Sequence, residues 1–194
     1  MRGTSGAVES GILAAAGACL TLAGAVCTVA VAAQQTAAPA RPCDGLEEHR
    51  QFDFWVGEWT VYDAQGTRLG TNSITRPDQE CMLVERWESA SGNRGTSINY
   101  FDPATERWVQ YWVAATSMLD LEGRFEGGAM RLEGIARSVH GPGVAGTRTR
   151  GTWTPLEDGR VRQTFERWNE DTGEWQLTFD GYYVRAEDTE GRNP

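Results

Sequence analysis

Residues 52 to 63, FDFWVGEWTVYD, place five aromatic side chains within eleven positions but interrupt them with Gly57 and Glu58. A strand that belongs to a flat apolar core does not need this interruption. A glycine inside a strand weakens the pairing unless the chain bends there or another group approaches closely. We therefore expect the stretch to bend across one end of a curved sheet, with its aromatic side chains divided between that end and the core.

The remaining sequence, up to residue 185, consists of short alternating segments separated by Gly, Asp, Asn and Pro turns, and no stretch sustains a helical period. This pattern predicts ten strands. They are expected at residues 55 to 63, 68 to 75, 80 to 88, 95 to 102, 106 to 114, 117 to 126, 129 to 138, 147 to 155, 160 to 168 and 175 to 185. Only LEEHRQF, residues 46 to 52, is typical of a short helix, which we expect to plug one end of the sheet.

Alternation within these strands separates an apolar face from a polar face. The inward apolar set is expected to include Leu119, Leu121, Phe125, Met130, Leu132, Trp153, Val161, Phe165, Leu177, Phe179 and Tyr183. Glycines recur on the same face at Gly123, Gly134, Gly151 and Gly181, which favours a strongly curved sheet. Ten hairpin-connected strands would leave two long edges exposed unless the sheet closes. The predicted fold class is therefore all-β, a single up-and-down antiparallel β-barrel of about ten strands with a short N-terminal helix.

The first part of the 194-residue chain differs in composition from the rest. Residues 10 to 33 carry no charge and end in small residues, which is typical of an export signal. The stretch is also long enough, at ~30 Å as a helix, to serve as an uncleaved membrane anchor. A lipoprotein signal is the third alternative, although neither Cys19 nor Cys27 has the expected Leu three residues before it. We expect a signal or anchor at 1 to 33, a linker at 34 to 48, the barrel domain at 49 to 186 and a disordered tail at 187 to 194.

Cys43 and Cys81 are the two cysteines that remain after the signal. In an oxidising compartment they are expected to form a disulfide, and the alternative is a pair of separate buried thiols. The expected location is periplasmic or secreted.

The formal net charge is −9, and the chain contains no Lys. This charge argues against nucleic acids and anionic membrane surfaces as partners. Contact with a membrane is expected only through an uncleaved N-terminal segment, and a small molecule is the expected partner.

Gly57 and Trp59 form a G-x-W pattern that resembles the one in the lipocalin and fatty-acid-binding barrels, the calycins. In those folds the Trp closes the floor of the barrel, and an Arg from the last strand lies over it. Arg185 ends the last predicted strand, YYVR, at the matching place. The resemblance implies that Trp59 is buried at the floor with Arg185 stacked near it.

Residues 49 to 185 as a whole resemble an uncharacterised bacterial family of exported proteins. The resemblance is carried by the motifs FDFWVGEWTV, CMLVERWES, GTSINYFDPATERWVQYWV, LEGRFEGGAM, TWTPLEDGRVRQTFERW and FDGYYVR. It implies a calycin-type barrel of unknown function. The chain departs from the family pattern at Val113-Ala114-Ala115, where family members often have an Asp after the Val.

Several polar residues fall on faces that otherwise favour burial, and buried polar groups need partners. Together with two Trp rings they would form a pocket with aromatic walls and a few hydrogen-bonding groups, as in small-molecule sites. The pocket candidates are Glu85, Trp87, Asn99, Gln110, Trp112 and Gln163. The alternative is a polar core whose groups satisfy one another without a ligand.

The sequence gives weaker signals for catalysis and for metals. Glu85 and Glu166 are the best acid/base pair if the protein is an enzyme. His49 and His140 are the only histidines, and no cluster of metal ligands is visible. The haem-binding nitrobindins are barrels of similar size that use a barrel-lining His, and neither His here lies on an inward strand face. A Tyr or Met ligand is the only remaining route to haem, so no cofactor is expected.

The predicted function is an exported, non-catalytic β-barrel that binds a small molecule. The alternatives are a structural or protein-interaction barrel without a ligand, and an enzyme that uses Glu85 as acid or base.

Overall fold

The computed structural model describes residues 43, 45 to 77, 81 to 140 and 146 to 190. The expected signal or anchor at 1 to 33 and most of the expected linker lie outside the described residues. No helix among the described residues is long and apolar enough to cross a membrane.

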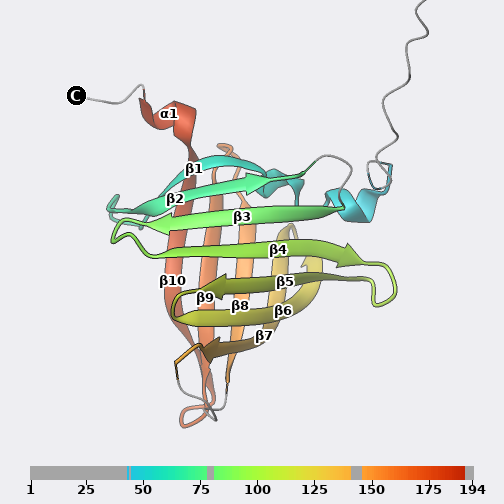
Figure 1. Cartoon of the computed structure of the whole chain (residues 1–194), viewed down its shortest axis with the longest axis vertical. Coiled ribbons are helices and arrows are strands. Elements are labelled where there is room, and N and C mark those ends of the chain that lie inside the picture. The colour runs from blue at the N-terminus through green and yellow to red at the C-terminus, as the bar shows by residue number, and fades with distance from the viewer. Residues whose placement is uncertain (1–42, 44, 78–80, 141–145, 191–194) are drawn as a thin grey trace, which may run out of the picture. The chain divides into compact units, whose positions relative to one another are not determined.

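Ten antiparallel strands form a closed barrel (Figure 1), which confirms the predicted all-β up-and-down architecture. Each strand pairs with its neighbours in sequence, and the last strand pairs with the first to close the sheet. The strands are β1 (Gly57–Tyr62), β2 (Arg68–Thr75), β3 (Met82–Ser89), β4 (Arg94–Asp102), β5 (Arg107–Ala114), β6 (Ser117–Glu126), β7 (Ala129–Ser138), β8 (Thr147–Pro155), β9 (Val161–Asn169) and β10 (Glu174–Arg185). In Figure 1, β2 to β7 cross in front of β8 to β10 at a steep angle.

The helical parts are short. Where the sequence predicts one helix at 46 to 52, the structure has two 3-10 helices, η1 (Glu47–Arg50) and η2 (Asp53–Trp55). Because η2 occupies residues 53 to 55, β1 begins two residues later than predicted. The helix α1 (Ala186–Glu190) follows β10 directly and covers the first part of the segment predicted to be a disordered tail.

The interruption in the opening stretch makes room for Arg185. The guanidinium carbon of Arg185 lies 3.9 Å from the centroid of the Trp59 ring, and Nη1 donates a hydrogen bond to the Val56 carbonyl at 2.8 Å. Gly57 has φ +145°, and a Cβ at this position would overlap Nη1 of Arg185. Trp59 and Arg185 are also register partners between β1 and β10. Gly57 is therefore required both for its backbone conformation and for the close approach of Arg185.

Aromatic side chains fill the end of the barrel next to η1 and η2. The ring of Phe52 stacks on Trp55 at a centroid distance of 4.9 Å and meets Trp108 and Trp153 edge-on at 5.5 and 5.4 Å. All four side chains are buried. Trp59 Nε1 donates to the Trp55 carbonyl at 2.8 Å, which ties β1 to this cluster. We call this end of the barrel the floor.

One predicted inward residue points the other way. Leu177 was expected on the apolar face, but its side chain is 58% exposed. A β-bulge between Leu177 and Phe179 shifts the register of β10 against β9. Because side chains alternate strictly along a strand, one extra residue reverses the face of every residue on one side of the bulge. The prediction for Leu177 was therefore wrong, and Phe179 and Tyr183 still face inward.

The inward glycines allow two neighbouring strands to approach closely. A Cβ at Gly123 on β6 would overlap the carbonyl oxygen of Arg131 on β7, and a Cβ at Gly134 on β7 would overlap that of Asp120 on β6. A side chain at either position would push the strands apart and flatten the wall.

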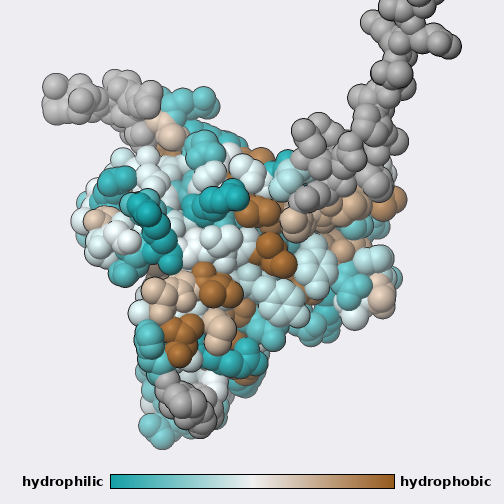
Figure 2. Space-filling model, in the orientation of Figure 1, coloured by the Kyte–Doolittle hydropathy of each residue, from teal (hydrophilic) through white to brown (hydrophobic). Residues whose placement is uncertain are grey.

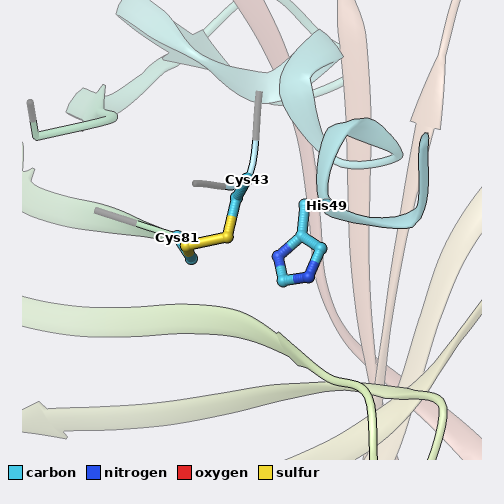
Figure 3. Close-up of side chains that lie close together, drawn as sticks. All are labelled: Cys43, His49 and Cys81. Carbon is cyan, nitrogen blue, oxygen red and sulfur yellow. A yellow bond between two sulfur atoms is a disulfide. The ribbon is translucent and has the colours of Figure 1, made fainter. Parts of the chain in front are cut away.

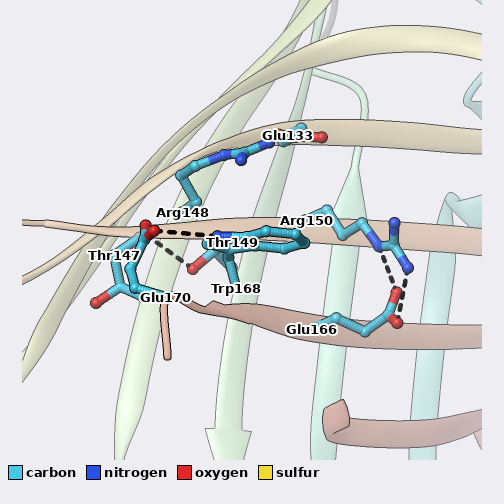
Figure 4. A network of polar contacts seen from close by, with 8 residues as sticks. All are labelled: Glu133, Thr147, Arg148, Thr149, Arg150, Glu166, Trp168 and Glu170. Carbon is cyan, nitrogen blue, oxygen red and sulfur yellow. Dashed lines mark hydrogen bonds and ion pairs between the residues drawn. The ribbon is translucent and has the colours of Figure 1, made fainter. Parts of the chain in front are cut away.

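The outer face of β7 to β10 carries cross-strand ion pairs (Figure 4). Arg148 pairs with Glu133, and Arg150 forms two hydrogen bonds with Glu166, at 2.6 and 2.8 Å. The guanidinium carbon of Arg148 also lies 5.2 Å from the ring centroid of Trp168. These charges satisfy one another on the outside of the barrel.

The outer face of β4 to β6 is more apolar, and Figure 2 shows apolar residues gathered in patches on the side of the molecule where these strands lie. Ile98 on β4 pairs in register with Tyr111 on β5, and Val113 on β5 pairs with Met118 on β6. All four side chains are exposed.

Candidate functional site

A cavity of about 480 Å³ occupies the half of the barrel away from the floor. Its size falls in the range of small-molecule sites, roughly 300 to 1,000 Å³. Its walls are largely apolar, and the apolar lining residues include Leu69, Trp87, Trp112, Leu119, Phe165 and Phe179. The rim carries the polar side chains of Ser89, Ser117, Arg167 and Thr178. Ser89 and Ser117 lie at the ends of β3 and β6, and Thr178 lies at the β-bulge of β10. Arg167 is exposed, so solvent reaches the cavity at this end.

The base of the cavity is polar and is built by hydrogen bonds between strands. On one side, Gln110 Nε2 donates to Asn99 Oδ1 at 2.8 Å, and Asn99 Nδ2 donates to Ser97 Oγ at 2.9 Å. Ser97 Oγ then donates to Glu85 Oε2 at 2.6 Å. These four side chains come from β5, β4 and β3, and all four are buried.

On the other side of the base, a second line of hydrogen bonds starts at the other carboxyl oxygen of Glu85, Oε1. Asn72 Nδ2 donates to Glu85 Oε1 at 2.7 Å and to the Tyr183 hydroxyl at 3.2 Å. The Tyr183 hydroxyl in turn donates to Gln163 Oε1. We call these seven connected side chains the Glu85 network: Gln110, Asn99, Ser97, Glu85, Asn72, Tyr183 and Gln163. It joins β5, β4, β3, β2, β10 and β9, so one line of polar contacts runs around much of the barrel interior.

Glu85 is the only ionisable carboxyl group in this network. Its side chain is 4% exposed, and burial raises its pKa from 4.5 to about 7, although the hydrogen bonds from Ser97 and Asn72 act in the opposite direction. Burial penalises the charged form because the interior solvates a charge poorly. Burial also raises the pKa of Tyr183 well above its usual value, with the nearby Glu85 carboxylate adding to the effect, so Tyr183 stays neutral.

The hydrogen bonds run in the direction that the ionised form of Glu85 requires, which is the form present above about pH 7. A carboxylate can only accept, so both of its neighbours must donate to it, and each next group in the line is fixed in turn. The line ends with Gln110 Oε1 on one side and Gln163 Nε2 on the other, and neither atom has a hydrogen-bond partner among the described residues. Both Gln110 and Gln163 line the cavity. The base thus offers one free acceptor and one free donor.

Five of the six pocket candidates from the sequence line this cavity: Glu85, Trp87, Gln110, Trp112 and Gln163. Asn99 does not line it, because its fully buried amide lies between Gln110 and Ser97 and serves as a link in the network.

Sequence reasoning missed several residues of the site, of which Asn72, Ser97, Thr149 and Arg167 matter most. Asn72 lies between the buried residues Gly70 and Ile74 on β2, so alternation along this strand marks it as an inward polar residue. Arg167 follows Gln163 and Phe165 at the same alternate positions on β9. The same signal that identified Gln163 could have identified both.

A second group of polar side chains lies near the floor (Figure 3). Cys43 and Cys81 form the predicted disulfide, with their Cα atoms 5.4 Å apart. His49 is buried beside them, and its ring meets Phe101 edge-on at 5.3 Å. Its Nδ1 has no hydrogen-bond partner among the described residues. One potential ligand atom from each of Cys43, His49 and Cys81 lies within 4.8 Å of the others, a grouping that the sequence did not reveal. Cysteine binds metals as the thiolate, so the bonded sulfurs leave only the imidazole as a ligand.

The proposed acid/base partners lie apart. Glu166 faces outward, and the pKa of its carboxyl is lowered by its hydrogen bonds with Arg150. It therefore does not share a site with Glu85. His140 is exposed, and neither histidine is among the residues that line the cavity.

Comparison of the sequence with models of known protein families and with curated proteins found no match in either case.

Proposed function

We propose that the protein is an exported β-barrel that binds a small molecule, and that the cavity above the Glu85 network is its binding site. The observation that carries the proposal is the composition of the cavity: aromatic walls, a polar base with a free donor and a free acceptor, and a rim that solvent reaches. Apolar walls supply affinity through buried area, and a few fixed polar groups supply orientation.

Export is part of the proposal and rests on two features. The apolar segment at residues 10 to 33 is typical of an export signal, and a disulfide such as Cys43–Cys81 persists in an oxidising compartment. A periplasmic or secreted location accounts for both.

The contact of Arg185 with Trp59 across a required Gly57 supports a calycin-type assignment of the barrel, because the G-x-W resemblance implies this contact. A calycin-type barrel fits a binding role, since such barrels hold their ligands in the interior.

Binding fits the geometry of Glu85 better than catalysis does. A general acid or base must reach the proton it transfers. Both oxygens of Glu85 already accept hydrogen bonds from Asn72 and Ser97, and Glu166 lies on the other face of the sheet. We assign Glu85 the role of fixing the direction of the network.

A protein-interaction role is the second candidate. It is favoured by the exposed side chains of Ile98, Tyr111, Val113 and Met118 on β4 to β6, because apolar residues that gather on an outer face often mark contact surfaces.

An uncharged dye tests the binding proposal. N-phenylnaphthylamine fluoresces strongly in apolar sites, so the full chain is expected to enhance its emission and to gain thermal stability from it. Ala136 lines the cavity, and Ala136→Trp is expected to fill it and abolish both effects. The control is Ala115→Trp, which adds the same ring at an exposed turn position. If the dye binds equally to both variants, the cavity is not the site, and the apolar outer face becomes the better candidate.

A further inference from the structure

Among the described side chains that line the cavity, Glu85 at the base is the one carboxyl group and Arg167 at the rim is the one cation. Arg167 follows Gln163 by four residues on β9, so their Cα atoms are ~13 Å apart along the strand. Gln163 belongs to the base, and Arg167 is therefore separated from the base by about the length of a small elongated molecule.

Arg167 differs from the neighbouring arginines of β8 and β9. Arg150 and Arg162 face outward and form two hydrogen bonds each, with Glu166 and Asp180. Among the described residues, the side chain of Arg167 has no partner in an ion pair or a hydrogen bond. A guanidinium presents donors in a planar fork that matches a carboxylate. In a chain of formal net charge −9, this inward cation is the feature that favours an anionic ligand over a cationic one.

The middle of the cavity is shaped by rings. Phe179 meets Trp87 edge-on at a centroid distance of 6.4 Å and lies 6.3 Å from Phe165, and Trp112 lines the same space. Aromatic walls favour a ligand with a ring in its body, because stacked and edge-on ring contacts add to the free energy of burial.

The base selects a polar group at the far end of the ligand. Gln110 Oε1 can accept a hydrogen bond, and Gln163 Nε2 can donate one. A hydroxyl group both donates and accepts, so it can satisfy either amide. A purely apolar end would instead leave both amides without partners once the ligand displaces water.

We propose that the cavity binds a hydroxylated aromatic or alicyclic carboxylic acid, with the carboxylate at Arg167, the ring among the aromatic walls and the hydroxyl at the amides of Gln110 and Gln163. This assignment rests on the proposed binding function and adds the chemical class of the ligand.

The test is isothermal titration calorimetry of the full chain with three probes. These are para-hydroxycinnamate, its uncharged methyl ester and cinnamate, which lacks the hydroxyl. We expect para-hydroxycinnamate to bind about tenfold more tightly than either analogue, because each analogue loses one polar contact. Arg167→Gln is expected to remove the preference for the acid over the ester and to leave the affinity for the ester unchanged.

Arg86→Gln is the matched control. Arg86 is exposed on β3 and is not among the cavity-lining residues, so this variant changes the net charge equally and is expected to keep the preference for the acid. Gln110→Met is expected to reduce the advantage of the hydroxylated acid over cinnamate. Because this variant also removes a partner of Asn99, its folding is checked by urea denaturation, and the comparison of ligands on the natural protein stands without it.

The outcomes separate the two proposals. If the three probes bind with equal affinity, or if none binds while N-phenylnaphthylamine still does, the ligand class is wrong and the binding cavity stands. If Arg86→Gln loses the preference for the acid as Arg167→Gln does, net charge and not Arg167 selects the ligand. If neither the dye nor any probe binds, the proposed function itself fails.

Discussion

Glu85 gives the sharpest test of the structure, because a buried carboxyl group couples folding to pH. Its pKa is raised from 4.5 to about 7 in the folded protein. One pKa unit corresponds to about 1.36 kcal/mol, so a rise of about 2.5 units corresponds to about 3 kcal/mol of folding free energy. Ionising Glu85 in the folded protein would thus cost a large share of the usual 5 to 15 kcal/mol of domain stability.

The sign follows from proton binding in the two states. Below pH 4.5 the carboxyl is protonated in both the folded and the unfolded chain, and the stabilising contribution is fully present. Between pH 4.5 and about 7 the folded state still holds the proton and the unfolded state has released it, so the free energy of unfolding falls as pH rises. Above about pH 7 the contribution is lost.

The assay is urea denaturation of the full chain, with its disulfide intact, at a series of pH values across this window. The wild-type free energy of unfolding is expected to fall by about 3 kcal/mol from pH 4.5 to above 7. Glu85→Gln carries a neutral amide in place of the carboxyl, so it is expected to lose most of this slope and to be the more stable protein at high pH.

Glu166→Gln is the control, because the pKa of the Glu166 carboxyl is lowered whereas that of Glu85 is raised. Arg150 lowers the pKa of Glu166, so its contribution is lost only as pH falls below the ordinary range of Glu, and the slope between pH 4.5 and 7 should remain as in the wild type. Equal slopes in the wild type and in Glu85→Gln would refute the buried, protonated carboxyl, and with it the pH-dependent direction of the network.

Three further predictions concern the framework, and urea denaturation measures each of them. Replacing both Cys43 and Cys81 with Ser should lower the free energy of unfolding by about 4 kcal/mol, because the bond closes a loop with a sequence separation of 38 residues; an unchanged midpoint would show that the bond does not constrain the unfolded chain. Trp59→Ala should cost roughly 3 to 5 kcal/mol through the cavity it leaves beneath Arg185, and a loss below 1 kcal/mol would contradict its place in the floor. Leu177→Ser should change stability by less than about 0.5 kcal/mol, since the bulge exposes this side chain; a large loss would mean that Leu177 faces the core after all.

The barrel could be predicted from the sequence because its information is local. Turn residues and strict alternation mark the strands, and all ten strands lie within two residues of their predicted ends. Closure follows because an open sheet of ten strands would expose two edges. The bulge at Leu177 could not be read in this way, because one extra residue leaves no compositional trace and yet reverses the face of the residues on one side of it.

The site was only partly predictable, for a reason that the network makes clear. Alternation marks which polar residues face inward, and it correctly brought Glu85, Gln110 and Gln163 to one cavity. It does not say which of them bind one another and which remain free. Asn99 has the same pattern as Gln110, yet it is a fully enclosed link, because that distinction depends on the pairing of β4 with β5.

Arg167 shows a further limit of alternation. An arginine near the end of a strand is usually a solvated surface group, and a surface ion pair there would contribute little. What distinguishes Arg167 is the absence of a carboxylate partner among the described residues, together with its place in the cavity lining. Both depend on the three-dimensional arrangement of strands that are distant in sequence. A ligand would therefore meet two kinds of polar group. One is a cation at the rim, and the other is a pair of amides at the base whose direction depends on whether Glu85 is ionised. A change of pH through about 7 should then alter the affinity for the proposed ligand through the base, even when the ligand's own carboxylate stays ionised.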